Sequence, residues 1–171
     1  MNMWEKIRMN RVRILIWGGV AFFTLLYVSL IFNQNVWTDE IFTLKLIEND
    51  FAGIIGGTAE DVHPPLYYFA ARIVRLLAGD SLQAQKLLTI VPMTLTLLLG
   101  ATKVRRFFSD AVACGFIWTL GCIPCTMEYA VQIRMYSMAL LAVTACGLYA
   151  LEAFETPKKT PWIWMTVSAL A

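Results

Sequence analysis

The sequence predicts an all-helical integral membrane protein, and three observations support this fold class. Hydrophobic residues make up 58% of the 171 residues, and the mean hydropathy is +0.62. That apolar share is above the roughly even share of a soluble domain. Charged residues are absent from four long windows of the chain, residues 14–32, 87–102, 111–127 and 135–151, and Lys and Arg gather beside the ends of these windows. Both patterns are typical of helices that cross a bilayer.

The four windows predict spans at about residues 14–32, 83–102, 111–127 and 135–152. A hydrocarbon core of about 30 Å needs roughly 17–25 helical residues. The second window reaches that length only when it extends back past Lys86, whose amine can reach the headgroups. A fifth apolar run begins at Pro161 and is cut off at Ala171. Since the first run is long and lacks a small-residue cleavage site, we expect an uncleaved signal anchor.

The basic residues predict the orientation of these spans. They lie before the first window, after the second and after the fourth: Lys6, Arg8, Arg11, Arg13, Lys103, Arg105, Arg106, Lys158 and Lys159. The positive-inside rule places all of them in the cytoplasm if residues 33–82 form one external loop. We therefore expect a cytoplasmic N-terminus.

The external loop should contain interfacial helices. Residues 65–79 are apolar enough to suggest a span, but Arg72 and Arg75 would each cost roughly 2.5–3.5 kcal/mol in hydrocarbon. We expect instead an amphipathic helix that begins at Pro65 and ends at Gly79. A shorter helix should follow Asp39. Three glycines should then break the chain before the His-Pro-Pro turn: Gly53, Gly56 and Gly57.

Three polar groups on the expected external face are candidates for chemistry. Asp39 and Glu40 follow the first span, although Thr38 or Asp39 could simply be the N-cap of a helix. His63 is the single histidine, and the two prolines after it hold its backbone extended, which suits metal or phosphate binding.

The third group lies where the third span gives way to the fourth and consists of Glu128, Arg134 and Tyr136. The planar guanidinium of Arg134 matches phosphate oxygens, so this residue is a candidate for binding a lipid phosphate. The alternative is that Arg134 lies at the membrane edge and only pairs with Glu128 or a lipid headgroup. Cys122 and Cys125 have the spacing of a redox motif, but the strand and βαβ unit that accompany such a motif are not predicted around them. The net charge of +2 does not require a nucleic-acid partner.

Two motifs of this sequence resemble the protein O-mannosyltransferase family. They are Trp37-x-Asp39-Glu40 and, some twenty residues later, Asp61-Val62-His63-Pro64-Pro65-Leu66. Their layout is also similar to bacterial relatives that include the lipid A aminoarabinose transferases. The later Glu128, Arg134-Met135-Tyr136 pattern is similar to bacterial members. The resemblance covers residues 33 to about 154.

The resemblance implies a GT-C fold, a multi-span helical bundle that uses a sugar linked to a polyprenyl phosphate and inverts its configuration. It implies that Asp39 is the general base and that Glu40 orients it or helps to hold a divalent cation. It places His63 at a metal or substrate contact, and Arg134, with Glu128 and Tyr136, at the substrate. The cation would be Mg, Mn or Zn. The expected location is a bacterial inner or plasma membrane.

Family enzymes are several times longer, so we expect this chain to be the N-terminal part of such an enzyme. Three classes of acceptor remain as alternatives: a protein, a lipid and a glycan. One alternative is a non-catalytic membrane module or one partner of a split transferase. A transporter or channel is disfavoured because residues 14–32, 87–102, 111–127 and 135–151 contain no charged residue.

Overall fold

The computed structural model describes residues 3–33, 35–59 and 63–170, and every regular element in these ranges is helical. Three stretches are long and apolar enough to cross a membrane: residues 10–32, 82–107 and 136–155. The first is α1 (Met3–Ser29), extended by the short turn η1 (Leu30–Phe32). The third is α9 (Tyr136–Glu155). The all-helical prediction is thus confirmed, and the first, second and fourth windows form helices that are long and apolar enough to cross a membrane.

The second stretch is made of three consecutive helical elements. It starts with α5 (Leu82–Leu99), continues through the π-helical turn η2 (Gly100–Val104) and ends with α6 (Arg105–Phe107). The hydroxyl of Ser81 accepts a hydrogen bond from the Ala84 N–H and caps the start of α5. The helix therefore includes Lys86, as the extended second window requires.

The third window differs from the expected straight span. It forms α7 (Asp110–Cys122) and α8 (Pro124–Val131), which meet at an angle of 71°. Pro124 is the first residue of α8, and Ile123 before it is extended. Proline disfavours a helical conformation in the preceding residue, so the chain turns there. The prediction of one continuous helix over 111–127 was wrong in this respect.

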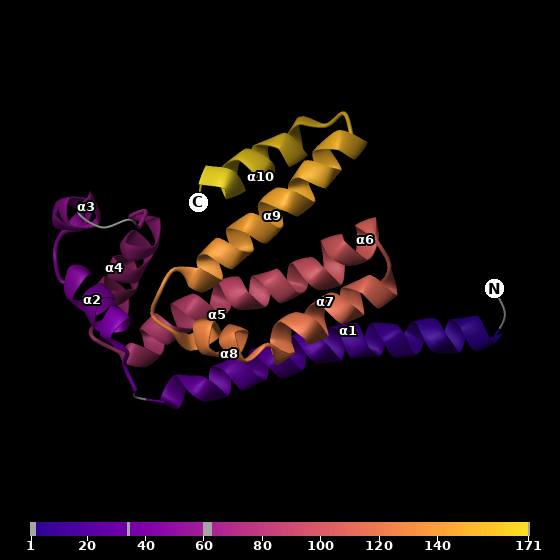
Figure 1. Ribbon diagram of the computed structural model, residues 1–171, viewed down its shortest axis with the longest axis horizontal. Helices are drawn as coiled ribbons and strands as arrows, with labels where there is room; N and C mark the ends of the chain where they lie inside the picture. The colour runs from indigo at the N-terminus through magenta and orange to yellow at the C-terminus, as the bar shows by residue number, and fades with distance from the viewer. Residues whose placement is uncertain (1–2, 34, 60–62, 171) are drawn as a thin grey trace.

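The core of the bundle lies between α1, α5 and α7, which run side by side (Figure 1). Its buried side chains include Phe23, Tyr27, Leu97 and Ile117. A Cβ added at Gly121 on α7 would lie 2.4 Å from the Phe23 ring, so the glycine allows α1 and α7 to approach closely. The chain then returns through α9, which contacts α5, and α10 (Lys159–Leu170), which packs against α9.

The expected loop between the first two spans folds into three short helices at one end of the bundle (Figure 1). They are α2 (Thr38–Leu46), α3 (Phe51–Ala59) and α4 (Leu66–Ala78), and they share a small buried cluster. The structure confirms the helix between Pro65 and Gly79. Gly79 has φ of 67°, a conformation that glycine adopts readily.

The three glycines do not break the chain as expected. Gly53, Gly56 and Gly57 all lie inside α3. The Asp50 carboxylate accepts a hydrogen bond of 2.7 Å from the Gly53 N–H and caps this helix, and Ile54 is fully buried against the neighbouring helices. Capping and burial outweigh the low helix propensity of glycine here.

Most of the Lys and Arg side chains that the structure describes lie at the opposite end of the bundle, which we call the basic end. There the carboxylate of Asp110 accepts from Arg105 at 2.7 Å, and Glu152 accepts from Lys103 and Arg106. The end that carries α2, α3 and α4 is called the loop end below. Figure 1 shows the two ends separated by the length of α1, α5 and α7.

Candidate functional site

The candidate site is at the loop end, where the first turn of α2 faces the start of α9 and the turn before it. Two cavities open there. One, of about 460 Å³, has Lys86 in its wall and is called the lysine cavity. The other, of about 430 Å³, has His63 in its wall and is called the histidine cavity. Asp39 and Tyr136 line both cavities, so they form the wall between them.

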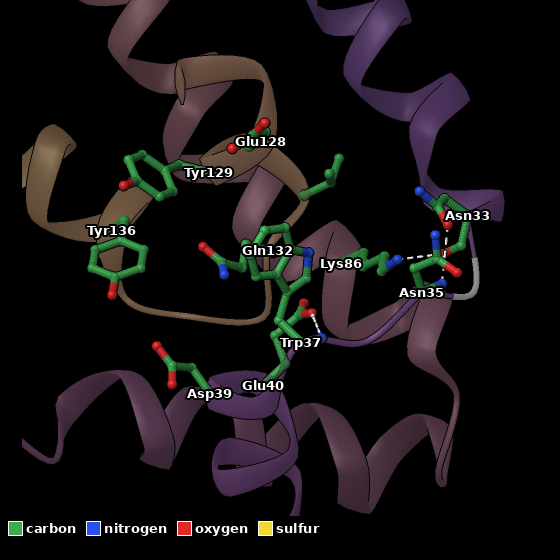
Figure 2. Close-up of a pocket in the computed structure, with 11 residues that line it drawn as sticks. Asn33, Asn35, Trp37, Asp39, Glu40, Lys86, Glu128, Tyr129, Gln132 and Tyr136 are labelled. Carbon is green, nitrogen blue, oxygen red and sulfur yellow. Dashed lines mark hydrogen bonds between the residues drawn. The ribbon is translucent and has the colours of Figure 1, made fainter. Parts of the chain in front are cut away.

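Asp39 is an exposed residue in the first turn of α2. Its carboxylate makes no hydrogen bond or ion pair within the described ranges. Figure 2 shows the carboxylate pointing away from α2 toward Tyr136. The helix is held through the Asp39 carbonyl instead, which accepts from Arg134 at 3.4 Å and from the Thr43 hydroxyl at 3.3 Å. The Asp39 side chain is therefore available to a ligand in either cavity.

Glu40 has a different environment, with only 1% of the residue exposed. One carboxylate oxygen accepts from the Trp37 N–H and the other from the Ile133 N–H, both at 2.7 Å. Glu40 thus joins the start of α2 to the segment between α8 and α9. Trp37 is the N-cap, so the alternative that Thr38 or Asp39 would cap this helix was wrong.

Arg134 lies beneath α2 and is 5% exposed. One terminal nitrogen, Nη1, makes three long contacts: to the Asp39 carbonyl at 3.4 Å, the Tyr68 hydroxyl at 3.4 Å and the Thr43 hydroxyl at 3.5 Å. The Nε atom has no hydrogen-bond partner in the described part of the chain. A guanidinium has five N–H donors, so Arg134 keeps donors for a ligand in the histidine cavity.

Tyr67 of α4 lies close to this cluster and is almost fully buried. Burial, with the negative charge of Glu40 as the second cause, raises the pKa of the Tyr67 phenol well above its usual range. The phenol is therefore neutral near pH 7, and Asp39 is a better candidate than Tyr67 for the base of this site.

Lys86 belongs to the site, although sequence reasoning placed it at the membrane edge as a snorkelling cation. It lies in α5, is 2% exposed, and donates a hydrogen bond to the Asn33 carbonyl (Figure 2). Its amine lines the lysine cavity together with Asp39 and Glu128. One signal in the sequence could have revealed it: an ionisable residue within an apolar helix is by default a candidate for function.

The structure brings the predicted residues together around Asp39. Glu40, Glu128 and Tyr136 line the lysine cavity with it, and His63, Arg134 and Tyr136 line the histidine cavity with it. These residues come from segments up to 97 positions apart in the chain. Asp61, which belongs to the second motif, lies outside the described residues.

A divalent cation was predicted from Glu40 and His63. Glu40 lines the lysine cavity and His63 the histidine cavity, and both oxygens of Glu40 already accept backbone N–H groups. Within residues 3–33, 35–59 and 63–170, no three His, Cys, Asp or Glu side chains are grouped to hold a metal ion. These two residues therefore do not fit as a metal pair.

The sequence motifs that suggested the protein O-mannosyltransferase family lie around Asp39, His63 and Arg134. The structure gathers these three residues at one end of an all-helical membrane protein. Comparison of the chain with protein-family models, with curated proteins and with solved structures found no match.

Proposed function

We propose that this chain is the N-terminal part of a membrane glycosyltransferase that moves a sugar from a polyprenyl-phosphate donor to an acceptor. The observation that carries the proposal is the position of Asp39. Its carboxylate has no partner within the described chain and lies between two cavities, each of which contains a buried cation. An inverting transfer needs one base beside the acceptor and positive charge beside the leaving phosphate.

The proposed reaction is a single displacement. The acceptor hydroxyl attacks the anomeric carbon of the donor sugar, and the bond from that carbon to the phosphate oxygen breaks. The carboxylate of Asp39 accepts the hydroxyl proton, and the polyprenyl phosphate leaves with the bonding electrons. This role requires a carboxylate within reach of the acceptor, and the exposed position of Asp39 between the cavities supports the assignment.

The leaving phosphate is assigned to the histidine cavity. Arg134 lines this cavity and retains unused donors, and His63 lies in the same wall. A guanidinium offers a planar set of N–H donors that matches phosphate oxygens. Because Arg134 is buried, its attraction for a developing negative charge is less screened than in water.

The acceptor hydroxyl is assigned to the lysine cavity, on the other side of Asp39 from the leaving phosphate, as an inverting displacement requires. The volume of this cavity, about 460 Å³, lies in the range of small-ligand sites. Its wall combines side chains that hydrogen-bond to hydroxyl groups, such as Glu128 and Gln132, with the aromatic rings of Tyr129 and Tyr136 (Figure 2). Lys86 adds one cation to this wall.

The proposal is tested by sugar transfer in membranes that contain the protein as its gene encodes it. Membranes are incubated with a radiolabelled polyprenyl-phosphate sugar, and wild type is compared with Asp39→Asn. Asp80→Asn is the matched control, because Asp80 is an exposed aspartate of the same region that lines neither cavity. We expect transfer by wild type and Asp80→Asn and its loss in Asp39→Asn.

The rival function is a non-catalytic membrane module. The role of Glu40 favours this alternative. Both of its carboxylate oxygens accept backbone N–H groups, so Glu40 joins two backbone segments and has no oxygen left for a ligand. If the protein is such a module, the wild type should not transfer sugar from the polyprenyl-phosphate donor. Normal transfer by Asp39→Asn would likewise contradict the assignment of Asp39 as the base.

A further inference from the structure

A third cavity lies at the basic end, far from Asp39. It has a volume of about 350 Å³ and is bounded by η2, α6, the end of α9 and the start of α10. Three cations line it, Lys103, Arg106 and Lys158, together with the single carboxylate of Glu152. We call it the basic cavity.

The basic cavity carries excess positive charge. The Glu152 carboxylate accepts from Lys103 and, at 2.9 Å, from Arg106, so one acidic group is shared by two cations. Lys158 is exposed and makes no ion pair or hydrogen bond within the described residues. With three cations against one carboxylate, the lining has a net charge of about +2 near pH 7. An anion in this cavity would meet uncompensated charge.

An apolar groove continues from the basic cavity along the bundle. It has a volume of about 390 Å³ and runs between α5, α9 and α10, with a lining that includes Leu98, Leu141 and Val167. Tyr149 and Trp164 line both the groove and the basic cavity, and their rings stack with centroids 6.2 Å apart. Charged and apolar surfaces therefore meet at one aromatic pair, as at the interface between headgroups and hydrocarbon.

We propose that the basic cavity and this groove form one binding site for an anionic glycerophospholipid. The phosphate would lie among Lys103, Arg106 and Lys158, and an acyl chain would lie along the groove. Basic pockets between membrane helices bind anionic headgroups, and aromatic residues mark the headgroup level. The charge at one end and the apolar lining at the other favour a lipid over a soluble anion. This site is separate from the sugar-transfer site and does not depend on the proposed function.

The test measures lipid binding by native mass spectrometry of the purified full chain, titrated with phosphatidylglycerol or phosphatidylcholine. The variant R106Q/K158Q removes two cations from the cavity. The control R11Q/K159Q removes two exposed cations that line neither the cavity nor the groove. Each cation should contribute about fivefold to the affinity, so we expect a loss of about 25-fold in phosphatidylglycerol affinity for R106Q/K158Q. The control should bind like wild type.

Two further variants keep the test decisive. K158Q alone changes an exposed, unpaired side chain and should lower phosphatidylglycerol affinity about fivefold even if the double variant does not fold. A142W fills the groove without changing charge, and it should also weaken binding of this lipid. Inorganic phosphate at millimolar concentration should not displace the lipid.

Four results would overturn the proposal. They are equal affinity of wild type for the two lipids, an equal loss in the R11Q/K159Q control, unchanged binding by A142W, and displacement of the lipid by inorganic phosphate. The last result would assign the cavity to a free phosphate. Unchanged binding by A142W would show that the groove belongs to another occupant, such as a second copy of this chain.

Discussion

Asp39 and Glu40 are neighbours in the chain, yet their carboxylates lie in different surroundings. Successive residues of a helix point about 100° apart, so one side chain of such a pair can face a cavity while the other faces the interior. Asp39 is exposed at the two cavities, whereas Glu40 is buried and bound by two backbone N–H groups. At the scale of single residues, the acidic pair therefore consists of one exposed carboxylate and one buried carboxylate that joins two backbone segments.

Replacement of Glu40 by glutamine should destabilise the loop end. The Trp37 and Ile133 N–H groups each donate to a separate oxygen of Glu40. A glutamine has a single acceptor oxygen, so one of these N–H groups would lose its partner. The expected cost is about 1–3 kcal/mol of unfolding free energy. Thermal unfolding in detergent measures it, with Glu48→Gln as the control because Glu48 is exposed. Equal unfolding temperatures for the two variants would show that the contacts of Glu40 are not important for stability.

Sequence reasoning identified Asp39, His63 and Arg134, because polar residues in motifs beside apolar windows are visible without a structure. It did not identify the role of Lys86. Whether a lysine near a span end reaches the headgroups or turns inward depends on its neighbours in space. Here the carbonyl of Asn33, 53 positions away, accepts its hydrogen bond and keeps the amine in the cavity. Such a partner cannot be read from local sequence.

At the scale of elements, two prolines in apolar helices have opposite effects. Pro92 lies inside α5 without ending it, whereas α7 ends before Pro124 and α8 begins there with a bend of 71°. α5 packs against α1, α4, α8 and α9, and these neighbours hold it as one helix. Hydropathy predicted both windows as spans, but it contains no information on these contacts. The glycines of α3 predicted a break for a related reason, because their low helix propensity contains no information on the capping and burial that keep this helix intact.

The close approach of α1 and α7 gives a test of the packing. Gly121→Ala places a methyl group against the buried ring of Phe23, and we expect a loss of about 1–3 kcal/mol in unfolding free energy. Gly115→Ala on the same helix is the matched control, since its Cβ would meet no atom within 4 Å. Both variants are compared by thermal unfolding in detergent. Equal stability of Gly121→Ala and Gly115→Ala would contradict the close contact between α1 and α7 at Gly121.

At the scale of the whole molecule, the bundle has two chemically different ends. The candidate site and the helices α2, α3 and α4 occupy the loop end, and the clusters around Asp110 and Glu152 occupy the basic end (Figure 1). The charge pattern of the sequence predicted this separation, since basic residues recur after every second crossing. The positive-inside rule further predicts that the basic end faces the cytoplasm.

Cysteine labelling in intact cells measures this orientation. The four native cysteines are replaced by alanine, because Cys122 and Cys125 are exposed and would react. A single cysteine is then placed at Asp80, at the loop end, or at Lys159, at the basic end; both positions are exposed. We expect a membrane-impermeant thiol reagent to label position 80 in intact cells and position 159 only after permeabilisation. Equal labelling of the two positions would contradict the single external loop.

Asp39 is proposed to remove the proton of the acceptor during sugar transfer. The most direct test of this role measures the single-turnover rate of transfer and the equilibrium affinity for the donor in wild type and Asp39→Asn. We predict that the rate falls by about 10²–10⁴-fold, the usual contribution of a positioned base, while donor affinity changes little. An unchanged rate in Asp39→Asn would contradict this role of Asp39, and so would a slower rate that weaker donor binding explains entirely.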